Sequence, residues 1–280
     1  MKQEFSFFKD FFVNIFRPKN LMHNVEFSSM SEKLLKFSGT FFLGQFITFF
    51  VAVFQLTALA IIAFIANFEF QNQLSIRNDI FGDPSRLLND IIILLLGLLF
   101  IVIIAPIFEE LIFRLHLKND KTQQAISFAL FVSYFLIPIT GGFLFKRYTS
   151  LSQTNISIII LLVGILTFLF LFVFLKYIFF DLKFVNSFIT NLYTKYFFVP
   201  FYLSVIIFGL IHILNYKPMP WYLYLFIPII TLTQLWLGYL FGYIRMRYGM
   251  IYSIVAHVLH NFAIVIVIGT LVAFLELLIT

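Results

Sequence analysis

The alternation of apolar and polar stretches along this chain predicts a series of membrane-spanning helices. Apolar residues form long runs separated by short polar stretches, and about 18 consecutive apolar residues are enough to suggest a membrane span. The predicted helical segments are 40–67, 91–116, 124–141, 155–180, 197–214, 222–243 and 250–279. The last segment is long enough for one strongly tilted helix or for a broken pair, so we expect seven or eight membrane helices.

Composition supports the same class of protein. Hydrophobic residues make up 61% of the 280 residues and charged residues only 11%, and 42 residues are Phe. A soluble domain of this size does not need so much apolar surface, so a soluble multi-domain protein is excluded. The chain has no cysteine, which excludes disulfides and thiolate metal sites. We therefore expect an all-α fold, a multi-pass transmembrane helical bundle.

The N-terminal segment 4–16 has a different pattern, because it is too short and too charged to span a bilayer. Plotted as a helix, it places Asp10 and Asn14 on a polar side and six apolar residues on the other: Phe5, Phe8, Phe11, Phe12, Ile15 and Phe16. Such an amphipathic helix lies either on the bilayer surface or on the protein's own cytoplasmic face. Residues 1–38 are predicted to be an amphipathic, basic segment preceding a transmembrane domain of residues 39–280.

The distribution of Lys and Arg predicts the orientation in the membrane. With seven helices, 14 of these residues fall on the side of the N-terminus and 5 on the opposite side. Basic residues gather in cytoplasmic loops, so the N-terminus is predicted to be cytoplasmic, in a multi-pass protein of the cell membrane. The lipid bilayer is the first partner that the sequence implies.

Two adjacent carboxylates and an arginine lie near the end of the second apolar segment, in Glu109-Glu110-x-x-x-Arg114. Ionisable residues at membrane depth are costly and normally face a protein interior, where they mark a functional site. On a helix, Glu110 and Arg114 are four residues apart and can pair on one face. Glu109 points about 100° away from Glu110. The spacing therefore gives the two acids different surroundings.

A few other polar residues interrupt the apolar segments. His212 follows Phe208 at the end of the fifth segment, and His257 shares a helix face with Asn261 in the last one. A buried Glu can take a proton from water with help from a His, and Asn and His can donate hydrogen bonds to an oxyanion. These residue types fit a hydrolytic site, but a proton relay or an ion pathway uses them too.

Taken in order, Glu109-Glu110-x-x-x-Arg114, Phe208-x-x-x-His212 and His257-x-x-x-Asn261 resemble the three motifs of the CPBP family. These are the CAAX-prenyl-endopeptidase-like intramembrane proteases, also called the Abi family. The stretch 238–249 before the third motif is similar to that family as well. The resemblance covers residues 91–261 and implies that segment 39–280 is a peptidase-like domain.

The resemblance also implies a role for each residue. Glu109 would be the base that activates water, assisted by His212, and His257 and Asn261 would stabilise the oxyanion. The structural or orienting residues would be Glu110, Arg114 and Phe208. The family has been described both as metalloproteases and as metal-free glutamate peptidases. We expect no cofactor. If a zinc ion is bound, its ligands would be Glu109, His212 and His257.

Two other functions remain open at this stage. One is a non-catalytic immunity, receptor or scaffold protein on the same fold. The other is a proton-coupled transporter that uses Glu109 and the histidines as a relay. The expected partner of the peptidase is a membrane-associated protein or peptide substrate, and no nucleic-acid partner is expected.

Overall fold

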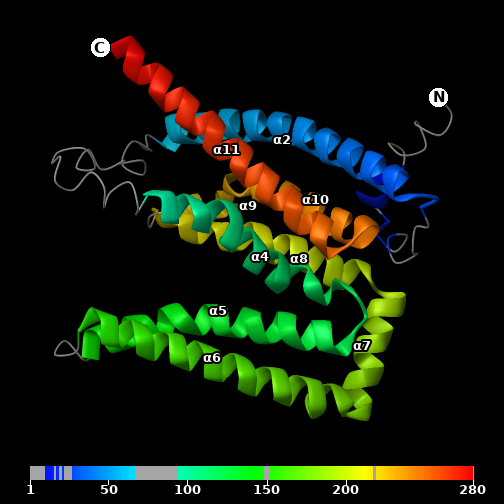
Figure 1. The fold of residues 1–280 in the computed structure, drawn as a ribbon. Coiled ribbons are helices and arrows are strands. Elements are labelled where there is room, and N and C mark those ends of the chain that lie inside the picture. Colours follow the sequence, from blue (N-terminus) through cyan, green and yellow to red (C-terminus); the bar gives the residue numbers. More distant parts are fainter. Residues whose placement is uncertain are drawn as a thin grey trace. The chain divides into compact units, whose positions relative to one another are not determined.

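The structure, a computed structural model, is all-α over the residues that it describes, which are 10–15, 17–18, 21, 27–66, 94–147, 152–216 and 219–279 (Figure 1). The longer helices are α2 (Met30–Ala66), α4 (Ala105–Phe113), α5 (Lys121–Arg147), α6 (Gln153–Tyr177), α7 (Lys183–Lys195), α8 (Phe198–Ile211), α10 (Leu232–Tyr248) and α11 (Met250–Ile279).

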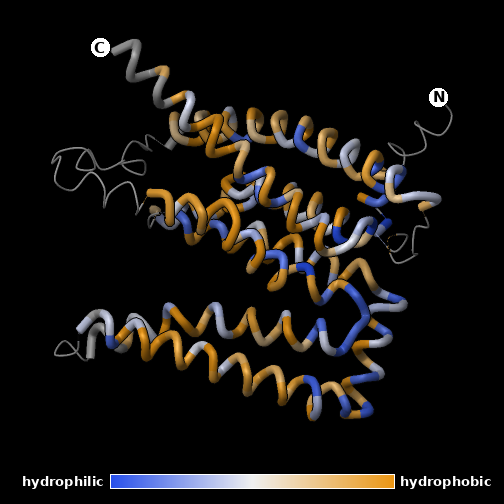
Figure 2. Tube along the Cα trace, in the orientation of Figure 1, coloured by the Kyte–Doolittle hydropathy of each residue, from blue (hydrophilic) through white to orange (hydrophobic). Residues whose placement is uncertain are grey.

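Within these ranges, seven helical segments are long and apolar enough to cross a membrane. They are Met30–Phe64, Leu94–Leu117, Lys121–Phe143, Thr154–Asp181, Phe198–Asn215, Trp221–Tyr248 and Met250–Leu271. Figure 2 shows hydrophobic residues along the length of these segments. The predicted all-α, multi-pass fold is confirmed, and the last segment is one continuous helix, α11, rather than a broken pair.

The first span begins earlier than hydropathy predicts, at Met30 instead of residue 40. Polar contacts around the first turn explain the difference. The hydroxyl of Ser29 accepts a hydrogen bond from the backbone N–H of Glu32 (3.1 Å), and the Glu32 carboxylate accepts one from the N–H of Ser28 (2.7 Å). This arrangement is of the capping-box type, which satisfies backbone N–H groups at the start of a helix.

The sixth span is broken near its start. A 3₁₀ helix, η8 (Trp221–Phe226), leads into the single turn α9 (Ile227–Ile230), and α10 follows after Thr231. The side chain of Gln55 on α2 bridges the break, because its amide donates to the carbonyl of Ile230 (2.6 Å) and accepts from the N–H of Thr233 (2.9 Å). An interrupted helix is tolerated in a bilayer only where such partners satisfy its backbone.

The chain divides into two compact units, and each is described by itself: residues 1–108 with 202–280, and residues 109–201. In the first unit, α10 packs against α2 and α11, and α11 also contacts the π-helical turn η4 (Phe100–Ile104). The turn from α10 into α11 is made by Gly249, whose φ of 109° and ψ of 174° are essentially restricted to glycine.

In the second unit, α5 and α6 pack along each other (Figure 1). The 3₁₀ helix η6 (Phe179–Asp181) follows α6 and precedes α7, a helix that the apolar pattern does not predict. Phe184 and Phe188 of α7 are exposed, whereas Tyr193 is buried. The mixed surface of α7 explains why a search for uniformly apolar segments passes over it.

The described part of the N-terminal amphipathic segment, residues 10–15, is helical and packs on α10. Phe11 is fully buried and makes edge-to-face contacts with Trp236, Tyr239 and Tyr243. Of the two expected placements, the structure supports the one on the protein's own surface. Residues 4–9 and 16 of the predicted helix lie outside the described residues.

A charged contact accompanies this packing. The guanidinium of Arg247, on the last turn of α10, lies 2.7 Å from the carboxylate of Asp10. Asn14, which the helical projection places on the polar side, is fully buried and donates to the carbonyl of Asp10 (2.7 Å). Phe12 and Val13 are exposed, so one face of the segment remains apolar and uncovered by the described residues.

Candidate functional site

The first motif lies at the end of α4, in the second unit. Glu110 and Arg114 are both fully buried, and Arg114 Nη1 lies 3.3 Å from Glu110 Oε1. The predicted ion pair is thus confirmed, and it follows from the four-residue spacing on one helix. Glu109 is partly exposed. The two neighbouring acids therefore have different surroundings, as the helical geometry predicts.

The end of α4 is fastened to α5 by Ser127. Its hydroxyl donates to the carbonyl of Ile112 (2.6 Å), so the same oxygen can accept from Nδ1 of His116 (3.2 Å). Ile112 and Phe113 are almost fully buried around this contact. These hydrogen bonds hold the end of α4, where Arg114 pairs with Glu110, against α5.

His212, in the first unit, is the first residue of the 3₁₀ helix η7 (His212–Asn215), directly after α8. Its Nδ1 lies 2.7 Å from the carbonyl oxygen of Phe208. A carbonyl only accepts, so Nδ1 carries the hydrogen and Nε2 of the neutral ring holds the lone pair. Burial raises the pKa of the phenol of Tyr216, the residue directly after η7.

The rings of the second and third motifs meet in the first unit. The Phe208 ring has its centroid 4.8 Å from that of His212 and 6.0 Å from that of His257, both edge to face. The Phe241 ring stacks on His257 at 4.4 Å with an angle of 23°. We call these four residues the histidine cluster. It brings together three segments of the chain, α8 with η7, α10 and α11.

Two glycines allow α8 and α10 to approach closely enough to form this cluster. A Cβ added at Gly238 would lie 3.1 Å from both the Phe208 ring and the carbonyl oxygen of Val205. A Cβ at Gly209 would lie 3.0 Å from the Cα of Leu235 and closer still to its side chain. Small residues serve this purpose at helix contacts in membranes. The absence of a side chain at Gly238 and Gly209 thus permits the close contact of α8 with α10.

Asn261 lies one turn after His257 on α11, and its side-chain amide donates to the carbonyl of Ile101 in η4 (3.0 Å). A π-helical turn leaves backbone groups without their usual helical partners, and such turns are frequent at functional sites. Asn261 thus holds the turn that precedes α4. An amide carries two N–H donors, so this contact is compatible with the predicted oxyanion role, which stays a prediction.

Sequence reasoning missed two residues of this region. Gln45 on α2 accepts from Nδ1 of His260 (2.8 Å), and Phe241 covers the face of His257. The hydroxyl of Ser253 donates to the carbonyl of Phe241 (2.9 Å) and so ties the base of α11 to α10. Gln45 could have been singled out from the sequence, because it is an amide side chain within an apolar segment. Phe241 is one of 42 phenylalanines in the chain, and nothing in the sequence distinguishes it from the rest.

Among the residues that the structure describes, no group of three His, Asp or Glu side chains could hold a metal ion. Glu109 belongs to a different unit from His212 and His257, so the alternative zinc set of these three residues stays a prediction.

The structure brings Phe208, His212 and His257 together, and it places Asn261 on the same helix as His257. Glu109, Glu110 and Arg114 belong to the other unit. No family model, curated protein or solved structure matches this chain.

Proposed function

We propose that this protein is an intramembrane endopeptidase of the CPBP type, which hydrolyses a peptide bond of a membrane-associated protein or peptide. The observation that carries the proposal is the contact of both His212 and His257 with the ring of Phe208. The second and third motifs are 45 positions apart in the chain, yet their histidines share one cluster.

The proposed reaction is general-base hydrolysis. Glu109 takes a proton from water while the water oxygen bonds to the peptide carbonyl carbon. The carbonyl oxygen becomes an oxyanion that accepts hydrogen bonds from His257 and Asn261. The proton then passes to the amide nitrogen, the C–N bond breaks, and an amine and a carboxylic acid leave.

Two features of the chain suit this chemistry. The carbonyl of Phe208 holds Nδ1–H of His212, so Nε2 is the nitrogen that can assist the proton transfer. The buried pair of Glu110 and Arg114 lies at the end of α4, the helix that also carries Glu109. The proposal requires one water within hydrogen-bond reach of Glu109 and His212, at about 2.6–3.2 Å from each.

The proposed setting is a cell membrane with the N-terminus in the cytoplasm, as the 14-to-5 distribution of Lys and Arg predicts. The substrate would reach the site from within the bilayer or from its surface.

Peptide turnover tests the proposal. The purified full-length protein is reconstituted in lipid vesicles with a library of apolar, membrane-inserting peptides, and new peptide termini are identified by mass spectrometry. We expect defined cleavage by the wild type and none by Glu109→Gln. The matched control is Glu32→Gln, which changes a carboxylate at the start of α2 and should cleave normally. A wild type without any cleavage, or equal cleavage by Glu109→Gln, would overturn the proposal.

The same assay decides the question of metal. Cleavage is measured before and after treatment with a strong chelator, together with the metal content of the purified protein. We expect activity to survive chelation. Near-stoichiometric zinc, with activity lost on chelation and restored by zinc, would make Glu109 a ligand instead of a base.

A further inference from the structure

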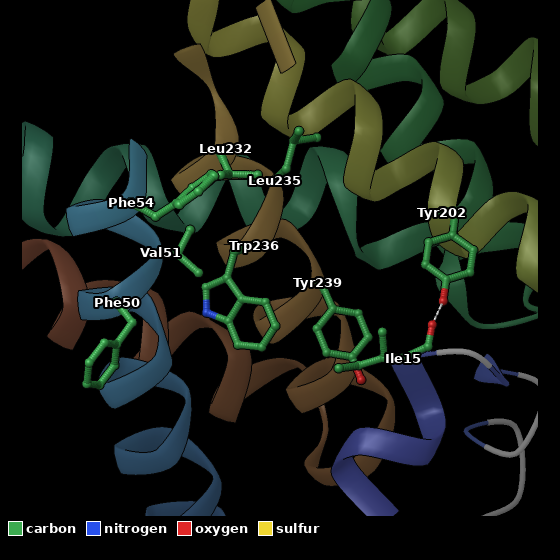
Figure 3. A pocket seen from close by; sticks show the side chains of 9 residues that line it. All are labelled: Ile15, Phe50, Val51, Phe54, Tyr202, Leu232, Leu235, Trp236 and Tyr239. Carbon is green, nitrogen blue, oxygen red and sulfur yellow. Dashed lines mark hydrogen bonds between the residues drawn. The ribbon is translucent and has the colours of Figure 1, made fainter. Parts of the chain in front are cut away.

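An apolar groove lies between α2 and α10 in the first unit, beside the N-terminal helix (Figure 3). Phe50, Val51 and Phe54 line it from α2, and Trp236 and Tyr239 line it from α10. Its volume is about 440 Å³, which falls in the range of small-molecule sites. The groove is separate from the histidine cluster, none of whose residues lines it.

The lining offers a ligand no polar group. The indole N–H of Trp236 donates to the hydroxyl of Thr48 (3.1 Å). The hydroxyls of Tyr239 and Tyr202 each donate to a backbone carbonyl of the N-terminal helix. Each of these polar side chains thus uses its donor within the protein and turns its ring toward the groove (Figure 3). A ligand held here must itself be apolar along its length.

The groove lies between two segments that are long and apolar enough to cross a membrane, and part of its lining is exposed. Both α2 and α10 belong to segments long enough to span a membrane, and Phe50 and Phe54 are more than half exposed. Apolar surface of this kind excludes water, so a hydrocarbon chain is the occupant that the bilayer itself supplies.

One end of the groove is formed by Ile15 and Tyr202, whose hydroxyl bonds to the Ile15 carbonyl. Arg17 follows two residues after Ile15 and is exposed. A cationic side chain at the bilayer surface attracts lipid phosphate. We propose that the groove binds one acyl chain of a phospholipid whose phosphate group is held by Arg17.

The two tryptophans of the chain make a direct test available. Trp221 is 78% exposed and away from the groove, so Trp221→Phe leaves Trp236 as the only indole. The full-length protein in detergent micelles is titrated with a phospholipid whose acyl chains carry bromine, which quenches tryptophan fluorescence on contact. We expect quenching that saturates near one lipid per protein. Quenching that rises linearly without saturation would mean contact with general lipid only and would overturn the proposal.

A matched pair of variants checks the location. Val51→Phe fills the groove, whereas Val53→Phe makes the same change two residues away, at a side chain that does not line the groove and is 47% exposed. We expect saturable quenching to be lost in Val51→Phe and kept in Val53→Phe. Equal behaviour of the two variants would place the lipid elsewhere. The wild-type titration remains decisive if Val51→Phe does not fold.

The phosphate contact is tested separately. We expect Arg17→Gln to weaken binding of the brominated phospholipid, and Lys183→Gln, which removes an exposed cation from α7, to leave it unchanged. Diacylglycerol with the same brominated chains lacks the phosphate and should bind more weakly to the wild type. Equal binding of diacylglycerol and phospholipid, or no effect of Arg17→Gln, would overturn the assignment of the phosphate to Arg17.

Discussion

Glu109 and Glu110 are adjacent in the sequence, yet they have different surroundings. Glu110 is fully buried with Arg114, whereas Glu109 is partly exposed. Replacing one partner of a buried ion pair leaves the other charge uncompensated in a medium of low dielectric constant. The two acids should therefore respond differently to the same substitution.

Glu110→Gln should lower the free energy of unfolding by about 3–5 kcal/mol, because the buried Arg114 loses its ion pair with this carboxylate. Glu109→Gln should abolish cleavage and unfold at nearly the wild-type temperature. Thermal unfolding of both purified variants in the same detergent, beside the cleavage assay, measures the two effects. A less stable Glu109→Gln together with a stable but inactive Glu110→Gln would reverse the roles.

For individual residues, the sequence predicts contacts between residues that lie close together on one helix. The pairing of Glu110 with Arg114 follows from helix geometry alone, and so does the common helix of His257 and Asn261. The stacking of Phe241 on His257 depends on how α10 and α11 pack after the turn at Gly249. Periodicity contains no information on such a contact, which is why it was not predicted.

At the scale of the elements, the close approach of α8 and α10 positions the Phe208 ring. Gly238 lies against the Phe208 ring and the backbone of Val205. A methyl group there has no free space, since a backbone carbonyl cannot move aside as a flexible side chain can. The contact links helix packing directly to the geometry of the histidine cluster.

Gly238→Ala should therefore lower the free energy of unfolding by about 1–3 kcal/mol and reduce cleavage, because α8 and α10 must separate. The matched control is Gly269→Ala on α11, where an added Cβ meets nothing within 4 Å. Unfolding and cleavage of both variants are compared in one detergent. Equal stability of the two would show that the helices are not in close contact at Gly238.

Hydropathy predicts all seven spans because each helix must present apolar side chains to lipid. Hydropathy does not predict the helical segments whose stability depends on something other than a long apolar run. The first turns of α2 depend on capping by Ser29 and Glu32, and α7 has a mixed surface. The break between α9 and α10 was also missed, since its backbone is satisfied by Gln55, which is 175 residues away from Ile230 in the chain.

For the whole molecule, the distribution of charge predicts the orientation. Lys19→Cys should be labelled by a membrane-impermeant thiol reagent only from the cytoplasmic side, and Lys146→Cys only from outside. The chain has no native cysteine, so each engineered thiol is labelled without background. Labelling of position 19 in intact cells, with position 146 protected, would contradict the orientation.

Hydrolysis as proposed requires Glu109 to share one water with the histidine cluster. Cross-linking measures the proximity of Glu109 to His212 directly. The double variant Glu109→Cys/His212→Cys is treated with a short thiol-specific cross-linker in the folded protein. The control pair is Glu109→Cys/Phe262→Cys, since Phe262 follows Asn261 on α11 and is exposed. We expect the first pair to cross-link and the second not to. A cross-link to position 262 without one to position 212 would show that Glu109 faces away from the histidines and would contradict the proposed site.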